Sequence, residues 1–480
     1  WCSIKTIRRT SNIGELMIIL GTNSIKDTGF NVANSLRFNS GSSDYLSKAF
    51  SSHGTRTKWT WSIWFKRSIL SGSNVLGACY FNDSNEDRLE IDSNGQMIWY
   101  SYQSNAYVGR LKTNRKFRDV SAWYHLVLRW DTGDSTADNR MKIWINGVEE
   151  TSFANRDNPS SDAESLFNYG DSSQQWVIGQ TANVNHWNGY MAEVVFCDNQ
   201  KLEPTSFGEY NSDSPTIWQP IDVSGLTFGT NGFYLDFEDS SALGNDAAGS
   251  NNFTVNNLTA IDQSTDTCTN NFATLNPLSV NTDQGTFSEG NLQLLHGSSA
   301  FRTGFASIGA SQGKWYCEIK RVTATSFAVG VISLDFKSIT PNITYMGGVG
   351  TPNLGYLRDG NTSVNGSETS GYESYANGDT LMIAMDLDNG KVYFAKNGNW
   401  GNSGDPTSGA TGTGARSITV GGETWSFGVS VFNATAQCNF GSPMYAISSG
   451  NADDNGYGNF EYDVPAGYYS LNTKNLAEFG

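Results

Sequence analysis

The sequence is poor in charged residues, in proline and in histidine. Charged residues make up 16% of its 480 residues, against roughly 25% in an average globular protein. There are 10 Pro and 4 His, and 31 Lys and Arg stand against 47 Asp and Glu. The resulting net charge of −16 comes without any cluster of basic residues. We therefore expect no nucleic-acid binding, because neutralising phosphates requires clustered Lys and Arg.

Long apolar runs are also missing. The longest one near the N-terminus is residues 16–20 (LMIIL), whereas a membrane-spanning helix needs about 20 apolar residues. A secretory signal needs an apolar core of about 7–15 residues, so we expect neither a leader nor membrane insertion. Residue 1 is Trp and the first methionine is Met17. We expect the natural chain to start at Met17, with residues 1–16 a non-native or upstream-translated extension.

The six cysteines contain no C-x-x-C pair. A zinc site of the usual local spacing is therefore not expected. A chain of this length can bury a sizeable core and does not depend on disulfides for stability. We predict free, mostly buried thiols.

Aromatic residues and glycine are abundant, with 13% Phe, Trp and Tyr and 51 Gly. So many aromatics exclude a disordered chain. Short runs with apolar residues at alternate positions recur along the sequence, which indicates strands with one buried face. No segment of a dozen residues keeps a helical period, and the best helical candidate is a single turn near 204–209. The sequence therefore predicts an all-β protein.

Four Asn-Gly pairs lie between two such runs and predict β-hairpins. They are residues 94–95, 146–147, 389–390 and 397–398. Asn-Gly is the strongest short-range hairpin signal, because a type I′ turn requires positive φ at both central residues. We therefore predict type I′ turns at these positions.

The predicted strands fall into two groups, which indicates two consecutive antiparallel β-sandwiches. Residues 17–240 form the first and residues 279–447 the second. Residues 241–278 are rich in Ser, Asn, Thr and Asp and are interpreted as a polar connector. Residues 448–480 regain aromatic residues, and we expect this C-terminal extension to pack on the second domain.

The first group resembles the concanavalin A-like sandwich of the laminin-G and pentraxin type. The resemblance is carried by residues 59–67 (WTWSIWFKR), 123–131 (WYHLVLRWD) leading into 142–147 (KIWING), and 187–194 (WNGYMAEV). The second group resembles the SPRY domain, another two-sheet sandwich. Here the matching stretches are 313–319 (GKWYCEI), 327–332 (FAVGVI), 376–379 (ANGD), 386–400 (DLDNGKVYFAKNGNW) and 439–441 (NFG).

Both groups together, with residues 270–277 (NNFATLNP) and 471–476 (LNTKNL), resemble virion surface, fibre or appendage proteins of marine tailed phages. This resemblance implies fold more firmly than function, because both kinds of sandwich host unrelated activities.

Catalytic patterns are weak in this sequence. Glycosidases need two carboxylates across the scissile bond, and the strand that supplies them in the related family is E-x-D-x-x-E. The nearest string, residues 90–95 (EIDSNG), ends in Gly, so Glu90 and Asp92 are interpreted as the solvent face of a strand. Asp386 and Asp388 flank a hairpin turn and are interpreted as its support. None of the histidines lies in a nucleophile motif, and His125 is predicted to be a packed core or edge residue. We expect no catalytic residues and no enzyme activity.

Calcium is the one cofactor that the resemblance leaves open. Laminin-G-like sandwiches hold calcium with Asp, Asn and backbone oxygens, and Asp83 and Asp131 lie in loops rich in such groups. The alternative is that these loops are simply solvated, which is the commoner case. We expect no other metal or cofactor.

Ligand binding without chemistry is the function that the composition favours. Saccharides are recognised by aromatic faces together with amide, carboxylate and hydroxyl groups, and two loops combine these. The candidates are Asn185, His186, Trp187 and Asn188 in the first domain, and Tyr356, Arg358, Asp359, Asn361 and Trp400 in the second. The alternative for each tryptophan is a place in the core, to which Trp61, Trp123 and Trp144 are assigned.

We therefore expect a non-enzymatic virion surface protein that binds a host-surface glycan or protein. It would be assembled in the host cytoplasm, as a homo-oligomer in contact with other virion proteins. Two alternatives are a purely structural decoration or fibre building block, and a polysaccharide depolymerase.

Overall fold

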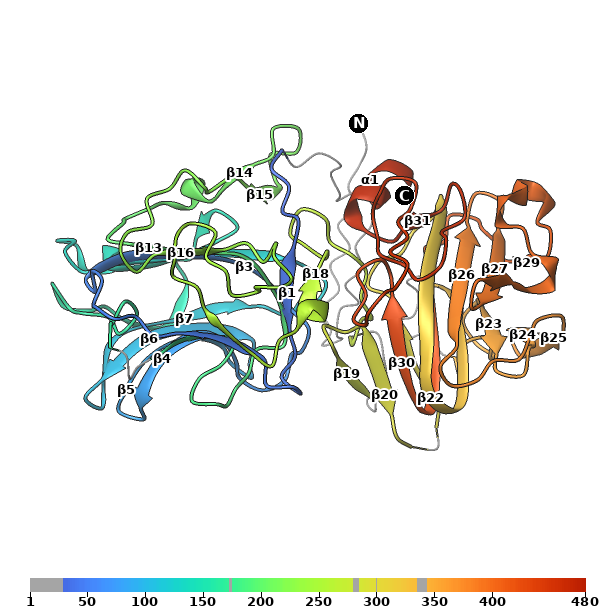
Figure 1. The fold of residues 1–480 in the computed structure, drawn as a ribbon, viewed down its shortest axis with the longest axis horizontal. Helices are drawn as coiled ribbons and strands as arrows, with labels where there is room; N and C mark the ends of the chain where they lie inside the picture. Colours follow the sequence, from blue (N-terminus) through green and yellow to red (C-terminus); the bar gives the residue numbers. More distant parts are fainter. Residues whose placement is uncertain (1–28, 172–174, 279–284, 299, 335–342) are drawn as a thin grey trace.

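The computed structural model describes residues 29–171, 175–278, 285–298, 300–334 and 343–480. Two β-rich bodies lie side by side (Figure 1). The predicted extension 1–16 and Met17 fall outside the described residues. The single helical turn expected near 204–209 is confirmed as a short 3-10 turn, Pro204–Ser206. Within the described part of the chain the one α-helix is α1 (Thr473–Phe479), at the C-terminus. The predicted all-β class is confirmed.

The first body is a sandwich of two antiparallel sheets. One sheet runs in the order β10 (Val148–Glu149), β9 (Met141–Ile145), β8 (Tyr124–Asp131), β3 (Lys58–Arg67), β13 (Gly189–Asp198), β1 (Ser35–Phe38), β18 (Gln263–Ser264), with β16 (Phe233–Leu235) also paired to β13. The other runs β11 (Phe153–Asp157), β7 (Ala106–Lys116), β6 (Gln96–Gln103), β5 (Asn85–Ile91), β4 (Asn74–Asn82), β12 (Trp176–Ile178), β2 (Tyr45–Lys48), β17 (Thr254–Asn256). A small pair, β14 (Gly208–Tyr210) and β15 (Trp218–Pro220), lies outside them.

Aromatic side chains fill the space between these two sheets. Trp59 and Trp61 alternate with polar residues on β3 and are fully buried. The Trp59 ring meets Trp99 of the opposite sheet at 5.6 Å between centroids. This alternation places one face of each strand in the core.

The second body is built on two long strands. Strands β22 (Lys314–Ser333) and β30 (Trp425–Asn439) pair along most of their length, in the order β19 (Thr286–Ser288), β20 (Gln293–His296), β30, β22, β23 (Asn353–Leu357), β24 (Thr362–Val364), β25 (Ser367–Thr369). The further strands are β21 (Arg302–Phe305) on β30, β26 (Thr380–Asp386) and β31 (Tyr469–Ser470) on β22, and β27 (Lys391–Lys396), which follows β26 and pairs with β28 (Asn399–Trp400) and β29 (Arg416–Ser417).

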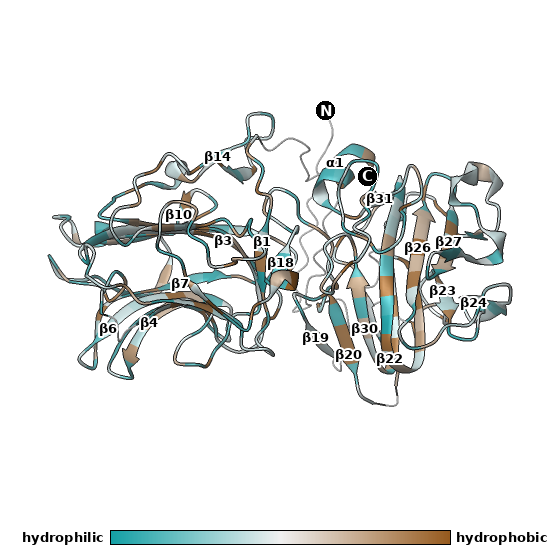
Figure 2. Ribbon diagram, in the orientation of Figure 1, coloured by the Kyte–Doolittle hydropathy of each residue, from teal (hydrophilic) through white to brown (hydrophobic). Residues whose placement is uncertain are grey.

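The edge of β22 that faces away from β30 pairs with two different strands. Its first half pairs with β26 and its second half with β23. The sheet therefore branches, and its buried faces share one hydrophobic core that includes Trp315, Phe394 and Phe427. Figure 2 shows hydrophobic and hydrophilic stretches alternating along β22.

The segment expected to be a polar connector is itself folded. Strand β17 pairs with β2, and β18 pairs with β1, so parts of residues 241–278 extend both sheets of the first sandwich. Further along, residues 270–277 and 471–476 lie against each other. Ala273 N–H donates to Leu471 O (2.9 Å) and Thr473 N–H donates to Asn271 O (3.0 Å). Residues 270–277 and 471–476 therefore form one paired structure.

Buried polar contacts join the two sandwiches. Arg37 on β1 is 1% exposed, and its Nη1 donates to Pro443 O (3.2 Å). Its Nε lies 3.6 Å from the Glu289 carboxylate. Tyr190 OH donates to Gly290 O (3.0 Å). The first sandwich is thus fixed to the second through side chains that are removed from solvent.

The type I′ prediction holds at two of the four Asn-Gly hairpins. Both residues have positive φ at 146–147 and at 397–398, whereas at 94–95 and 389–390 only the glycine does. The prediction is wrong at the latter two. In each of them a preceding aspartate accepts the N–H of the Asn, at 2.9 Å and 3.0 Å (Asp92 and Asp386). These side-chain hydrogen bonds, an Asx turn at Asp92 and a longer-range contact at Asp386, accompany turns in which only the glycine is left-handed.

Five cysteines lie in the described residues and all are free, as predicted. The assignment of Trp61 and Trp144 to buried positions is confirmed, although Trp144 belongs to a smaller cluster outside the main core. Trp123 is only half-buried. Its Nε1 donates to Asp266 (3.1 Å), because it lies where the chain leaves the first sandwich rather than between its sheets.

Candidate ligand site

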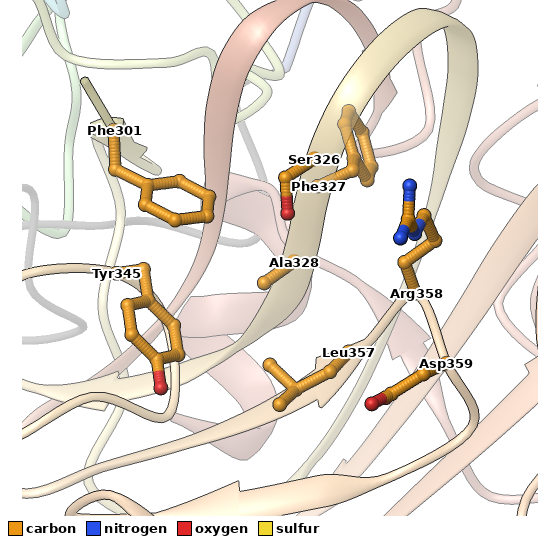
Figure 3. A pocket seen from close by; sticks show the side chains of 8 residues that line it. All are labelled: Phe301, Ser326, Phe327, Ala328, Tyr345, Leu357, Arg358 and Asp359. Carbon is orange, nitrogen blue, oxygen red and sulfur yellow. The ribbon is translucent and has the colours of Figure 1, made fainter. Parts of the chain in front are cut away.

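A pocket of about 270 Å³ lies in the second sandwich, where β22 and the end of β23 meet the chain before β21. Figure 3 shows Phe301 and Tyr345 on one side and Arg358 and Asp359 on the other. The side chains between them are Ser326, Phe327 and Ala328 of β22 and Leu357 of β23.

The first wall of the pocket is aromatic. The Phe301 and Tyr345 rings lie 5.1 Å apart, tilted by 34°. Phe301 also packs edge-on against Phe432 of β30 at 5.3 Å. Both wall residues are partly exposed, so they offer apolar ring surface whose orientation is fixed by neighbouring rings.

The opposite wall is charged and held by hydrogen bonds. Arg358 Nη1 donates to Thr325 O (2.8 Å). The Asp359 carboxylate accepts from Asn361 N and Nδ2, both at 3.1 Å. Asn361 Nδ2 also donates to Glu368 (2.8 Å). Arg358 and Asp359 remain exposed, so a guanidinium and a carboxylate face solvent in set positions.

Of the five candidates predicted in the second domain, two line this pocket, one supports a lining residue and two lie elsewhere. Arg358 and Asp359 line it, and Asn361 orients Asp359. The prediction that Tyr356 contacts a ligand is wrong. It is 1% exposed and its hydroxyl donates to Glu373 O, because alternation on β23 turns it into the core. Trp400 does not line the pocket; it is half-buried, with its ring edge-on to Tyr393 at 6.5 Å.

In the first domain the predicted loop contributes less surface than expected. Trp187 is fully buried and packs edge-on against Phe65 at 5.8 Å, so it cannot present its ring to a ligand. Asn188 is 5% exposed and bonds to Ser68 and Ser40. Asn185 and His186 remain at the surface.

Sequence reasoning missed the aromatic wall. Phe301 and Tyr345 stand in polar stretches far apart in the chain, and only the pairing of β21 with β30 and the return of the chain to β23 bring them together. An isolated aromatic in a polar stretch was the one available signal.

The histidine predicted in the core carries no nucleophile chemistry. His125 is fully buried, stacked on Trp64 at 4.6 Å. Trp218 Nε1 donates to its Nδ1 (2.8 Å), so Nε2 carries the proton and donates to Ser62 Oγ (2.8 Å). A base that already donates to the serine cannot take the serine's proton. Burial lowers the pKa of His125 to about 3.

The carboxylates considered for acid–base catalysis have structural contacts. Asp386 is fully buried, with Lys314 Nζ at 3.3 Å, and it supports the turn as expected by accepting from Asn389 N (3.0 Å). Asp388 instead accepts from Gly313 N (2.7 Å), which lies outside the turn. Asp92 bonds to Lys112 (2.8 Å) and caps its turn. Glu90 is on the outer sheet face as expected, but it is 7% exposed rather than solvated, and burial raises its pKa.

Neither calcium candidate is arranged as a metal site. Asp131 lies 2.8 Å from Lys201 Nζ, so an ammonium occupies the place of a cation. Asp83 accepts from Tyr80 OH (2.8 Å). Among the described residues no three His, Cys, Asp or Glu side chains are grouped to hold a metal ion. Across the same residues no helix is long and apolar enough to cross a membrane.

The family comparison concerns the first sandwich. Residues 40–204 match the family model of the concanavalin A-like lectin/glucanases superfamily, of laminin G type. No curated protein matches the chain.

Solved structures of both predicted kinds are similar to this chain. The SPRY domain of human HERC1 is 17% identical and covers 34% of this chain and 96% of its own, with a TM-score of 0.26. Domains LG4-5 of the mouse laminin alpha1 chain are 10% identical, and the match covers 88% of this chain and 91% of theirs, with a TM-score of 0.29. A SAP-like pentraxin from Limulus polyphemus is 12% identical, and the match covers 48% of this chain and 95% of its own, with a TM-score of 0.27. Identities of this size concern the fold and assign no ligand.

Proposed function

We propose that this chain is a non-enzymatic surface protein of a phage virion, and that it binds a host-surface glycan or protein through the second sandwich. The observation that carries the proposal is the pocket with Phe301 and Tyr345 on one wall and Arg358 and Asp359 on the other. An apolar ring face opposite a fixed donor and acceptor suits a ligand that has one apolar and one polar side. A sugar ring and a polar peptide side chain both meet this description.

The composition of the pocket favours binding over catalysis. Asp359 is the one carboxylate among its lining residues in the described part of the chain. Hydrolysis of a glycosidic bond requires a second carboxyl group across the bond. Asp359 is exposed and accepts two hydrogen bonds from Asn361.

The virion setting is the part of the proposal that rests on sequence resemblance. A fibre or capsid carries many copies of a protein, so weak binding at one pocket gains strength through multivalency. We propose a homo-oligomer in contact with other virion proteins. The net charge of −16 argues against electrostatic steering toward an acidic cell envelope, so contact would depend on aromatic and amide groups.

A glycan array, whole host cells and a reducing-sugar assay test the binding role. The wild-type chain is compared with Phe301→Ala, which removes one aromatic wall, and with Tyr210→Ala, an exposed tyrosine outside the pocket. We expect binding that Phe301→Ala weakens and Tyr210→Ala retains, without sugar release. Release of oligosaccharides would support a depolymerase instead. Absence of binding to both glycans and host cells would support a purely structural role. Absence of the protein from purified particles, by mass spectrometry, would contradict the virion assignment.

A further inference from the structure

A lysine is buried on the outer face of the sheet that contains β3. Lys66 follows Phe65, which points into the core between the two sheets, so the Lys66 side chain points to the opposite face. It is nevertheless only 1% exposed, because residues 266–272 lie over it. A lysine is almost never buried to this degree unless its charge is paired.

Three oxygen atoms of the covering segment surround the Lys66 ammonium group. Its Nζ donates to Asp266 Oδ2 (2.7 Å), to Asn271 Oδ1 (2.7 Å) and to Phe272 O (3.3 Å). The Asp266 side chain is also 1% exposed, and Asn271 is 8% exposed. An amine, a carboxylate and a carboxamide are therefore held against one another away from solvent.

The carboxylate and the carboxamide are each held in position by a further contact. Trp123 Nε1 donates to the other carboxylate oxygen of Asp266 (3.1 Å). Asn271 Nδ2 donates to Ser121 O (2.6 Å). A carbonyl can only accept and an ammonium can only donate, so these contacts fix which end of the Asn271 amide faces Lys66.

An aromatic ring closes the site on the side of the sheet. Tyr190 of β13 is opposite Lys66 in the strand register, and its ring centroid lies 5.5 Å from Nζ. Tyr190 is 1% exposed and packs against Trp123 at 6.2 Å between centroids. Separate charges on Lys66 and Asp266 are costly in such surroundings, and the transfer of one proton between them removes both charges.

We infer that Lys66 and Asn271 become joined by an intramolecular isopeptide bond, with Asp266 carrying the protons. Asp266 takes a proton from the Lys66 ammonium, and the free amine attacks Asn271 Cγ, which is one bond away from the oxygen that Nζ already contacts. A C–Nζ bond forms and the C–Nδ2 bond breaks. Nζ gives up two protons in all, which Asp266 passes to Nδ2, so that nitrogen leaves as ammonium. No electron is gained or lost and no co-reactant is needed.

The chemistry of the leaving group selects Asn271 over Asp266 as the residue that is attacked. The amine nitrogen is a nucleophile once it has lost its proton, and the neutral amide of Asn271 offers it an electrophilic carbon. The carboxylate of Asp266 is anionic, which repels a nucleophile but makes it a proton acceptor. A Lys66–Asp266 amide would release water in place of ammonia, so the two products differ in mass.

The bond joins two residues that are 205 positions apart in the chain. It fixes the covering segment to β3 at the residue whose backbone oxygen also accepts from Thr473 N (3.0 Å), next to the start of α1. A covalent link across so long a loop removes many conformations from the unfolded chain. This modification is independent of the ligand pocket and of the virion setting.

Peptide mapping of the denatured full chain by mass spectrometry tests this inference. We expect one tryptic product in which the peptides of Lys66 and Asn271 are joined, lighter than the two together by one ammonia. Trypsin should not cleave after Lys66, because the linked side chain carries no positive charge. Succinimide formation at an Asn-Gly pair loses the same mass but leaves peptides unlinked, so the map separates the two events.

Two variants and a matched control assign the roles. Lys66→Arg and Asp266→Asn should give no linked product and should have the intact mass that each sequence requires. Lys142→Arg alters another lysine of the same sandwich, which is paired with Glu149 (2.9 Å), and should keep the link. An unlinked Lys66 peptide in the wild type overturns the inference even where a variant fails to fold. A product that has lost water, or an undiminished link in Asp266→Asn, would also overturn it.

Discussion

Single buried titratable groups couple the stability of the first sandwich to pH. Glu193 on β13 is 5% exposed and adopts a φ of 49° at an irregularity in the strand. Tyr234 OH donates to it (2.7 Å). The pKa of Glu193 is raised to about 8, chiefly by burial and in addition by the acidic Asp236 and Glu238, while the hydrogen bond from Tyr234 opposes the rise.

Glu193→Gln should make the stability of the protein less sensitive to a rise in pH between about 4.5 and 8. The folded carboxyl holds its proton up to about pH 8, whereas the unfolded one releases it near 4.5. Its contribution to stability is therefore complete below pH 4.5 and is lost as the pH rises through 8. We expect the unfolding free energy of Glu193→Gln to gain on the wild type by roughly 2–5 kcal/mol between pH 4.5 and 8. Urea unfolding at a series of pH values measures this, and parallel pH profiles for the two proteins would contradict it.

The pH dependence of stability that His125 contributes has the opposite sign to that of Glu193. Its pKa falls from 6.5 to about 3 on burial, so its contribution is complete above pH 6.5 and is lost as the pH falls toward 3. His125→Ala also leaves the Trp218 N–H and the Ser62 hydroxyl without their buried partner. We expect a loss of roughly 2–4 kcal/mol at pH 7, together with a flatter stability profile below pH 6.5. A variant with wild-type stability at pH 7 would show that this network contributes nothing.

Hairpins are the elements that the sequence predicted best, and they also show where prediction stopped. All four Asn-Gly pairs do connect antiparallel neighbours, because glycine accepts positive φ at low cost. The turn type followed the local sequence at 146–147, but at 94–95 an aspartate side chain replaced part of the backbone pattern. Propensity for one pair of residues does not include the hydrogen bonds of its neighbours.

Gly147→Ala tests how far one hairpin depends on its glycine. Gly147 has φ 77°, and an added Cβ would lie 2.5 Å from the Trp218 ring. Gly72 in the same sandwich has φ 72° with open space around it. We expect Gly72→Ala to cost about 1 kcal/mol from backbone strain, and Gly147→Ala to cost about 2–4 kcal/mol because the clash adds to the strain. Thermal denaturation compares the two, and equal losses would rule out the packing contribution of Trp218.

Site residues were harder to predict than elements. Arg358 and Asp359 were predicted because their loop combines an aromatic residue with polar groups, and both do line the pocket. The prediction of Trp187 as a ligand-binding residue is wrong, because the sequence of its loop does not reveal that the ring turns inward against Phe65. Phe301 and Tyr345 could not be found at all, since their proximity is created by strand pairing between distant segments.

At the scale of the whole molecule, the junction makes one unit of two sandwiches. Arg37 connects β1 to the carbonyl of Pro443 and to Glu289. The stretch 270–277 also pairs with residues 471–476, which run into the C-terminal helix α1. The sequence indicated two domains and a connector, but a polar connector gave no sign that its own strands would extend the first sandwich.

Arg37→Ala should uncouple the two sandwiches. The change leaves the Pro443 carbonyl without this donor and the Glu289 carboxylate with its hydrogen bond from Asn39, at a cost of about 1–3 kcal/mol. We expect one calorimetric unfolding transition for the wild type and two separate ones for Arg37→Ala. Arg156→Ala removes an exposed ion pair with Asp138 and should keep the single transition. Two transitions already present in the wild type would contradict the coupling.

The central claim is that the chain binds a host-surface ligand through the pocket of the second sandwich without cleaving it. The most direct measurement is a glycan and host-cell binding assay run in parallel on the wild type, Phe301→Ala and Arg358→Ala. The account predicts a wild-type signal that both variants reduce by about tenfold, with no reducing sugar released. An undiminished signal in both pocket variants, or release of oligosaccharides by the wild type, would contradict it.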